Sequence, residues 1–453
     1  MGRAGLKMNM KTKFREVAGC IVAPRGFRAA GVFCDIKRLG TGKGSDKGKK
    51  RDLAILYSEV PAAVAGMFTT NQVCAAPVKV CVERRRGGWA QAVVVNSGNA
   101  NACTGNQGMA DAREMVTLTE QALGLELGLA LVGSTGRIGV AMPMDNVRAG
   151  IIEAAAMLGD APENADHAAE AIMTSDTRAK QVSIEIRLGG RKVRIGGMCK
   201  GAGMIQPGMS ATGKRPAATP LHATMLCFVT TDAAIDPATL QGMLEEAVAQ
   251  SFNRITVDGD MSTNDTVLVL ANGMAGNSIE ALQTAGSAEA KLFQAALNHV
   301  CLELAKMIVR DGEGVSKFVT VRVEGAKSFK DADAAARAVA NSPLVKTSWH
   351  GGDPNWGRII DALGYSPAKV VEEKVDIGYS APGSSRILWS LNKGQPTEAT
   401  FRDLCAAVAP AAFDLHIRLN LGGSSAVMYA ADLTEEYVEF NKGDVSDPTS
   451  LGG

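Results

Sequence analysis

The sequence lacks the features that mark several large classes of protein. Among its 453 residues, aromatic side chains make up only 5%. No apolar stretch reaches the length of about 18 residues that a transmembrane helix needs. The 48 basic and 47 acidic side chains nearly cancel to a net charge of +1, so no excess of one sign is available to hold nucleic acid or an anionic membrane. We therefore expect small-molecule partners, no nucleic acid and no membrane.

The spacings typical of metal sites and disulfide frameworks are also missing. The nine cysteines are odd in number, widely spread and never spaced Cys-x-x-Cys, and the five histidines are never four residues apart on a helix. These patterns predict reduced thiols in a cytoplasmic protein and no metal site. The first residues are basic but no apolar stretch follows them, so we expect no secretory signal, with an organelle transit peptide as the alternative.

Short apolar runs alternate with helical periodicities along the chain, which is typical of an α/β protein. Strands are predicted at 92–96, 181–188, 192–195, 224–231, 266–271, 318–323, 374–379 and 414–421. Helices are predicted at 110–124, 143–158, 161–173, 287–309 and 331–340, with another opened by Asp236-Pro237. Because helices do not regularly separate the strands, we expect an α/β (α+β) fold of layered mixed or antiparallel sheets sandwiched by helices, not a doubly wound parallel sheet.

Two polar stretches interrupt this pattern. Residues 40–52, rich in glycine and lysine, are predicted to form a solvated loop, and residues 207–222 a flexible, exposed linker. The second stretch nearly matches a phosphate-binding loop. However, Arg215 stands where a hydroxyl would be needed to hold magnesium, so we do not expect it to bind a nucleotide.

Several clusters of glycine and polar residues follow apolar runs. They are VNSGNANACTG (95–105), GSTGRIG (133–139), KGAGMI (200–205), VDGDMSTNDT (257–266), RDGEG (310–314) and GGDPNWGR (351–358). Any one of them could be only a turn, because Gly, Asn and Asp tolerate left-handed backbone angles. Their number favours one shared site built from loops.

These motifs, in this order, resemble the ornithine acetyltransferase family, the glutamate N-acetyltransferases that are bifunctional enzymes of arginine biosynthesis. The resemblance covers nearly the whole chain and includes MTSDT (173–177), GGMCKGAGMIQPGM (196–209), ATMLCFVTTDA (223–233) and SFNRITVDGDMSTNDT (251–266). It implies a self-cleaving enzyme with an N-terminal threonine nucleophile, cut between Ala223 and Thr224 into an alpha chain, 1–223, and a beta chain, 224–453. Other Ala-Thr pairs occur at 211–212 and 218–219, but only Thr224 opens an apolar run, MLCFV.

The resemblance also implies roles for individual residues. Thr224 is the expected nucleophile, and Thr135 and Gly136 match the pair that forms the oxyanion hole. The expected substrate-binding residues are Thr174, Lys200, Thr224, Glu313, Asn441 and Ser446. A free α-amine has a pKa of about 8, well below the roughly 10.4 of lysine, so Thr224 could supply its own base after cleavage.

The reaction that the resemblance implies is ping-pong transfer of acetyl from N2-acetylornithine to glutamate. It needs no metal or redox cofactor; acetyl-CoA is a co-substrate that some members also use. The family assembles as a heterotetramer of two alpha and two beta chains. In this sequence, residues 210–222 intervene before the cleavage junction, 447–453 extend past the usual end, and Ser446 replaces a usual threonine. The alternatives are an aminopeptidase or amidohydrolase of the related self-processing fold, and a non-catalytic relative that binds amino acids.

Overall fold

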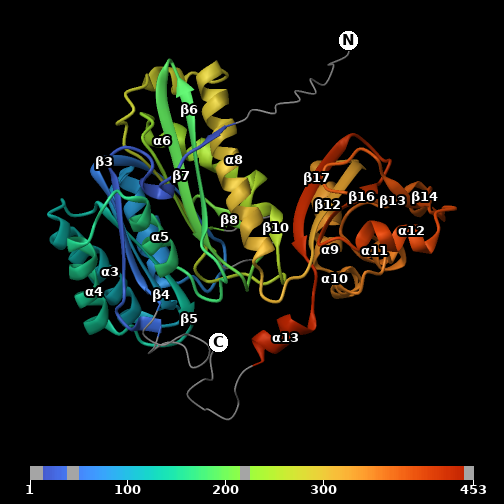
Figure 1. Cartoon of the computed structure of the whole chain (residues 1–453), viewed down its shortest axis with the longest axis horizontal. Coiled ribbons are helices and arrows are strands. Elements are labelled where there is room, and N and C mark those ends of the chain that lie inside the picture. The colour runs from blue at the N-terminus through green and yellow to red at the C-terminus, as the bar shows by residue number, and fades with distance from the viewer. Residues whose placement is uncertain (1–13, 38–49, 215–224, 443–453) are drawn as a thin grey trace.

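The computed structural model describes residues 14–37, 50–214 and 225–442, arranged as two lobes, each built on its own β-sheet (Figure 1). The predicted residues Ala223, Thr224 and Ser446 lie outside this part. The division of the chain at 223/224 therefore stays a prediction.

The first lobe contains a ten-stranded mixed sheet in the order β1-β6-β7-β9-β11-β3-β4-β5, with β2 and β8 also paired to β3. Its strands are β1 (Arg15–Glu16), β2 (Phe27–Val32), β3 (Leu53–Thr69), β4 (Trp89–Asn99), β5 (Ala130–Arg137), β6 (Lys180–Leu188), β7 (Arg191–Lys200), β8 (Met209–Ser210), β9 (Leu226–Thr231) and β11 (Thr266–Ala271). The pairs β4/β5 and β9/β11 are parallel, whereas β6/β7, β7/β9 and β3/β11 are antiparallel.

Helices cover both faces of this sheet. One face carries α2 (Ala76–Arg84), α3 (Gly105–Leu123), α4 (Met144–Ala156) and α5 (Pro162–Ala171), and the other carries α6 (Pro237–Gln250), α7 (Ile279–Gln283) and α8 (Ala288–Arg310). Along β9, Leu226 and Phe228 enter the first core, and Cys227 and Val229 enter the second. A strand buried on both faces must be apolar at every position, which explains the run MLCFV.

Among the described helices, only α8 is long and apolar enough to cross a membrane by length and composition. Its apolar side chains, including Phe293, Val300 and Leu304, pack in the second core, and the helix lies against β6 and β7. It is therefore built into the first lobe as a core helix.

The second lobe contains a seven-stranded mixed sheet in the order β10-β17-β12-β16-β13-β14-β15. Its strands are β10 (Ile255–Thr256), β12 (Phe318–Ala326), β13 (Asp376–Ser380), β14 (Leu388–Asn392), β15 (Gln395–Pro396), β16 (Ala412–Arg418) and β17 (Ser424–Ala431). Its helices are α9 (Phe329–Asn341), α10 (Pro343–His350), α11 (Trp356–Gly364) and α12 (Phe401–Val408). After β17 the chain turns back toward the first lobe as α13 (Glu435–Asn441) (Figure 1).

The predicted layering of mixed sheets with helices is confirmed, as are most predicted elements. Gly189 and Gly190, with φ of 54° and 80°, form the turn between β6 and β7. The Asp236 side chain accepts hydrogen bonds from the backbone amides of Ala238 and Thr239 and caps α6, as its position before Pro237 predicts. The long strand β3 and the helices of 342–364 were not anticipated from the pattern.

The prediction of an exposed linker at 207–222 is wrong at its start. Met209 is buried and pairs with β3 as part of β8, and its backbone amide donates to Asn253 Oδ1 at 3.0 Å. Backbone groups that find partners in a sheet do not form a linker. Residues 215–222 lie outside the described residues. In the predicted loop at 40–52, Asp52 is buried and accepts the backbone amides of Cys34 and Lys37.

Candidate active site

Three adjacent strands in the middle of the first sheet, β7, β9 and β11, end or begin at the same end of the sheet. Lys200, the last residue of β7, pairs with Leu226, the first residue of β9, and Leu226 pairs in turn with Thr266, the first residue of β11. Met225, directly before β9, is fully buried. The register therefore brings Lys200 and the loop before β11 to the point where β9 begins, two residues after the predicted nucleophile.

Thr135 and Gly136 lie near the end of β5, where it runs beside β4. Gly136 has φ of +129°, and a Cβ atom there would lie 2.3 Å from the carbonyl carbon of Gly98. Only glycine fits this close approach of two backbones. Asn264, from the loop before β11, donates to the carbonyls of Ala100 and Ser134 at 2.7 and 2.8 Å, which fixes the ends of β4 and β5 against that loop.

The Lys200 ammonium group joins two of the other predicted residues. Its Nζ donates to Thr135 Oγ1 at 3.2 Å and to Thr174 Oγ1 at 2.7 Å, and the side chain is almost completely buried. Burial lowers the pKa of Lys200, and the nearby carboxylate of Asp176 opposes that effect. Among the described residues its hydrogen-bond partners are these two hydroxyl groups, so the buried cation retains donor capacity for an anionic ligand.

A buried ionic network lies directly behind this cation. Lys180 Nζ donates to Asp176 Oδ1 at 2.5 Å and also to Asp311. Asp176 further accepts the backbone amides of Thr174 and Gly201 at 3.0 and 2.7 Å. Asp311 in turn accepts the amide and the hydroxyl of Thr177. The network thus ties together the loops that carry Thr174, Lys200 and the RDGEG motif.

The charges in this network determine its titration. Burial would raise the pKa of Asp176, but Lys200, Lys180 and the Gly201 amide hold it at about 2. Burial would likewise lower the pKa of Lys180, yet the carboxylates of Asp176 and Asp311 outweigh it and raise that pKa. Both partners are therefore charged near neutral pH, and three loops are fixed by ion pairs rather than by apolar packing.

Glu313 sits beside the loop that follows Lys200. Its backbone amide donates to the Ala202 carbonyl at 3.0 Å, and Asn441 Nδ2 donates to its Oε2 at 2.9 Å. A Cβ atom on Gly203 would lie 2.3 Å from that same Oε2. The absence of a side chain at Gly203, the second glycine of KGAGMI, leaves room for the carboxylate in this position.

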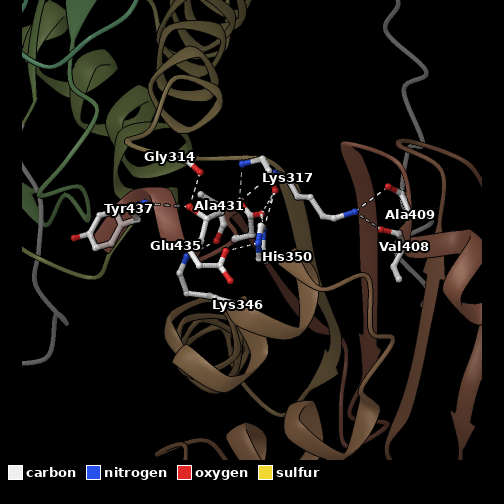
Figure 2. Close-up of polar contacts among 12 residues, drawn as sticks. Gly314, Lys317, Lys346, His350, Val408, Ala409, Ala431, Glu435 and Tyr437 are labelled. Atoms are coloured by element: carbon white, nitrogen blue, oxygen red, sulfur yellow. Dashed lines mark hydrogen bonds and ion pairs between the residues drawn. The ribbon is translucent and has the colours of Figure 1, made fainter. Parts of the chain in front are cut away.

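The segment that carries Asn441 is anchored to the loop after Glu313 (Figure 2). The Thr434 hydroxyl donates to the Gly314 carbonyl at 2.7 Å and accepts the Tyr437 amide at 3.1 Å, which caps α13. His350 Nε2 lies 2.8 Å from Glu435 Oε2, and Asp432 accepts the backbone amides of Ser316 and Lys317. These contacts direct α13 toward Glu313.

Two aspartates of the VDGDMSTNDT motif also accept hydrogen bonds from segments of the site. Asp258 accepts the backbone amides of Met204 and Ile205 at 2.6 and 2.8 Å, which fixes the loop after Lys200. Asp265 Oδ1 accepts the Met225 amide at 2.5 Å. Burial raises the pKa of Asp265 well above its ordinary value, against the opposing effects of the Met225 amide and Lys200.

The structure thus brings together all of the predicted site residues that it describes. GGDPNWGR lies in the second lobe, and no hydrogen bond among the described residues joins it to the other glycine-rich clusters, so its place in one shared site stays a prediction. There Asn355 caps α11 by accepting the Arg358 amide at 3.1 Å. The predicted site residues do not include four charged residues that the structure places here: Asp176, Lys180, Asp265 and Asp311. The three aspartates lie inside the motifs MTSDT, VDGDMSTNDT and RDGEG, and this position in the sequence is what could have identified them.

Within the described residues, no group of three or more His, Cys, Asp or Glu side chains could hold a metal ion. The nine cysteines all fall in the described ranges and are free thiols, most of them buried. Burial raises the pKa of several of them, including Cys20 and Cys81, each to about 12. Such buried thiols are poor nucleophiles.

Comparisons with known proteins agree with one another. A family model described as the ArgJ family matches residues 28–443. The arginine biosynthesis bifunctional protein ArgJ of Symbiobacterium thermophilum is 48% identical over 429 residues, 94% of this chain and 98% of the relative. That of Geobacter sulfurreducens is 45% identical over 417 residues, 92% and 98% of the two chains. A chain of ornithine acetyltransferase complexed with ornithine, from Mycobacterium tuberculosis, is 38% identical with a TM-score of 0.38, covering 42% of this chain and 96% of that chain.

Proposed function

Because the chain belongs to the ArgJ family, the bifunctional acetyltransferases of arginine biosynthesis, we propose that it transfers acetyl from N2-acetylornithine to glutamate through an acetyl-threonine intermediate. The observation that carries this proposal is the convergence of Thr135, Thr174 and Lys200 beside the start of β9. That strand begins two residues after Thr224, the proposed nucleophile.

The proposed reaction has two half-reactions at one hydroxyl. Thr224 Oγ1 attacks the acetyl carbon of N2-acetylornithine, ornithine leaves, and glutamate then takes the acetyl group from the threonine ester. The α-amine of Thr224, with a pKa of about 8, takes and returns the hydroxyl proton. Neither step changes an oxidation state or needs an electrophile beyond the oxyanion site, so we expect no metal or redox cofactor. Acetyl-CoA is a second donor to be tested.

Thr135 and Gly136 are the proposed oxyanion hole. The Thr135 oxygen accepts a hydrogen bond from Lys200, which leaves the hydroxyl hydrogen free to donate, and the backbone at Gly136 is rigidly held against Gly98. Donors that are fixed before the reaction stabilise the tetrahedral intermediate without reorganisation. The loss of one such donor typically costs about 3 kcal/mol of transition-state stabilisation.

Substrate recognition follows from placed charges. An amino-acid substrate carries a carboxylate, which complements the buried Lys200 ammonium group, and an amine, which complements Glu313 and its partner Asn441. Thr174 adds a hydroxyl beside Lys200. Ser446 is proposed to join Asn441 from the C-terminal end. A few such charges explain how a chain of nearly zero net charge recognises a zwitterion.

The α-amine of Thr224 becomes free only when the peptide bond before it is cut, so we propose self-cleavage between Ala223 and Thr224. The chains 1–223 and 224–453 would then share the first sheet, because β7 comes from one and β9 from the other. We expect them to stay together as a folded unit and to pair into a heterotetramer.

The test is to purify the protein and run it on a denaturing gel. Two bands are expected, the second with an N-terminal sequence of Thr-Met-Leu, while Thr224→Ala stays as a single inactive chain. Native protein that is one intact chain with full transfer activity contradicts the mechanism. N-acetylornithine and acetyl-CoA are then compared at equal glutamate. Free acetate as the sole product indicates a hydrolase instead.

A further inference from the structure

Helix α13, which carries Asn441, has no apolar core of its own to hold it in place. It is seven residues long and none of its residues is buried; Tyr437 is half-buried and the others are exposed. An isolated helix of this length is not stable in water. The position of Asn441 therefore depends on the polar contacts that α13 makes with the rest of the molecule.

Tyr437 makes two hydrogen bonds that lead in different directions. Its hydroxyl donates to Asp258 Oδ2 at 3.3 Å, and its backbone carbonyl accepts a hydrogen bond from Asn441 Nδ2 at 2.9 Å. Burial and the negative charge of Asp258 raise the pKa of the Tyr437 hydroxyl, so it keeps its hydrogen and acts as a donor. Tyr437 thus connects Asp258 to the side-chain amide of Asn441.

Both ends of this connection lie in the candidate active site. Asp258 also accepts two backbone amides of the loop after Lys200, at 2.6 and 2.8 Å. Asn441 Nδ2 also donates to Glu313 Oε2 at 2.9 Å. The Tyr437 hydroxyl therefore ties α13 to the loop after Lys200, and the Tyr437 carbonyl orients the amide group that contacts Glu313.

The backbone of Tyr437 also fits closely against the RDGEG motif (Figure 2). Gly314 has φ of +65°, and a Cβ atom there would lie 2.4 Å from the Tyr437 nitrogen. The Thr434 hydroxyl accepts the Tyr437 amide and donates to the Gly314 carbonyl. Tyr437 is thus held at its nitrogen, its carbonyl and its hydroxyl, between the loop that carries Glu313 and the loop after Lys200.

Resting on the proposed function, we propose that Tyr437 is a positioning residue that determines substrate affinity. Its hydroxyl fixes α13 so that Asn441 holds the Glu313 carboxylate toward the substrate amine. Because Tyr437 acts through Asn441 and not on the reacting atoms, loss of its hydroxyl weakens the binding of substrate and transition state alike. Such a loss raises KM and leaves kcat unchanged.

Two tyrosines allow a matched comparison. Tyr437→Phe removes the hydroxyl and keeps both the ring and the backbone carbonyl that binds Asn441. Tyr365→Phe makes the same chemical change at an exposed tyrosine of the second lobe, directly after α11. The double variant Tyr437→Phe with Asn441→Ala tests whether the hydroxyl acts through Asn441.

Steady-state kinetics with N-acetylornithine and glutamate measures KM and kcat for each purified protein. Tyr437→Phe is expected to raise KM about tenfold, the low end of the effect of a hydrogen bond to a charged group, with kcat within about twofold. Tyr365→Phe is expected to keep the native KM. Asn441→Ala is expected to raise KM by itself, and adding Tyr437→Phe to it to raise KM by less than about twofold further, because the group through which Tyr437 acts is already gone.

Thermal melts establish which variants are folded. A folded Tyr437→Phe with the native KM, or with a lower kcat at unchanged KM, overturns the positioning role and leaves the proposed function intact. The same conclusion follows if the two KM increases multiply in the double variant. A Tyr437→Phe that does not fold while Tyr365→Phe does also overturns it, because the hydroxyl then supports the fold and not the site. Native protein without transfer activity overturns the proposed function itself.

Discussion

Lys180 in the first lobe and Lys317 and Lys346 in the second are all buried, but they have different partners. In the first lobe, Lys180 Nζ donates to the carboxylates of Asp176 and Asp311, which raise its pKa. In the second lobe, Lys317 Nζ donates to the carbonyls of Val408 and Ala409 at 2.8 Å, and Lys346 Nζ to that of Ala431 (Figure 2). Burial lowers the pKa of Lys317, and it lowers that of Lys346 to about 8.

The different partners show which of these buried lysines are stabilised in the charged form. Carbonyl partners satisfy the hydrogens of an ammonium group but do not offset the loss of its hydration, whereas the carboxylates of Asp176 and Asp311 do so for Lys180. The second lobe uses lysines to join strand and helix ends. The first lobe holds a set of ionised groups behind Lys200, at the place where a zwitterionic substrate is proposed to bind.

The largest expected effect comes from Lys180→Met. It removes the cation that two buried carboxylates share and is expected to lower the free energy of unfolding by about 3–5 kcal/mol. Lys346→Met, the matched change in the second lobe, leaves only a carbonyl unpaired and is expected to cost about 1–3 kcal/mol. Urea denaturation measures both, and equal losses would remove the distinction between the lobes.

Lys200→Met tests the charge that faces the substrate. Loss of the ammonium group is expected to lower kcat/KM about a hundredfold, equivalent to about 3 kcal/mol. Lys200→Arg keeps the charge and serves as the control, with a smaller loss. Steady-state kinetics with N-acetylornithine and glutamate gives both values. A Met variant that performs as well as the Arg variant would show that the charge has no part in recognition.

The ionic network also predicts an acid limb of stability. The Asp176 pKa of about 2 is depressed below its value of about 3.9 in the unfolded chain, so its contribution is complete above about pH 4. That contribution, about 2 kcal/mol, is lost as the pH falls toward 2. Unfolding followed at successive pH values should show this loss in the native protein and a shallower slope in Asp176→Asn. Identical slopes would mean that Asp176 is not held ionised by its neighbours.

The smallest effect is expected in the glycine-rich cluster of the second lobe. Asn355→Ala removes the cap of α11 and should lower stability by about 1 kcal/mol. Transfer activity should stay within about twofold of the native value, because the cap acts on a helix away from Lys200. A thermal melt and one activity assay suffice. A large loss of activity with unchanged stability would show that this cluster takes part in the active site.

Much of the fold could be predicted because local signals agreed with the tertiary structure. The apolar runs at 226–231 and 266–271 are strands buried on both faces, and Asp236-Pro237 starts a helix by the capping geometry that it predicts. Residues 53–69 form a single long strand that lacks one period, because consecutive residues are buried at both of its ends and its middle is exposed at Glu59 and Pro61. Pattern alone cannot recover such an element.

Some residues of the candidate site could likewise be predicted from the sequence, and others could not. Thr135, Gly136, Lys200 and Glu313 sit in motifs that a family resemblance identifies. Asp176, Asp265 and Asp311 belong to the same motifs, but their importance comes from burial and from partners far away in sequence. An aspartate in a polar loop is usually solvated. Their burial, the contact of Asp265 with Met225 and that of Asp311 with Lys180 distinguish these acids from ordinary loop residues.

The most direct test of the proposed function is to trap the acyl-enzyme. The native protein is incubated with N-acetylornithine in the absence of glutamate, quenched in acid and examined by intact-mass and peptide mass spectrometry. Two polypeptides are expected, with one acetyl group on the hydroxyl of the N-terminal residue Thr224 that is removed when glutamate is added. A fully active single chain, or an acetyl group on any other residue, would contradict it.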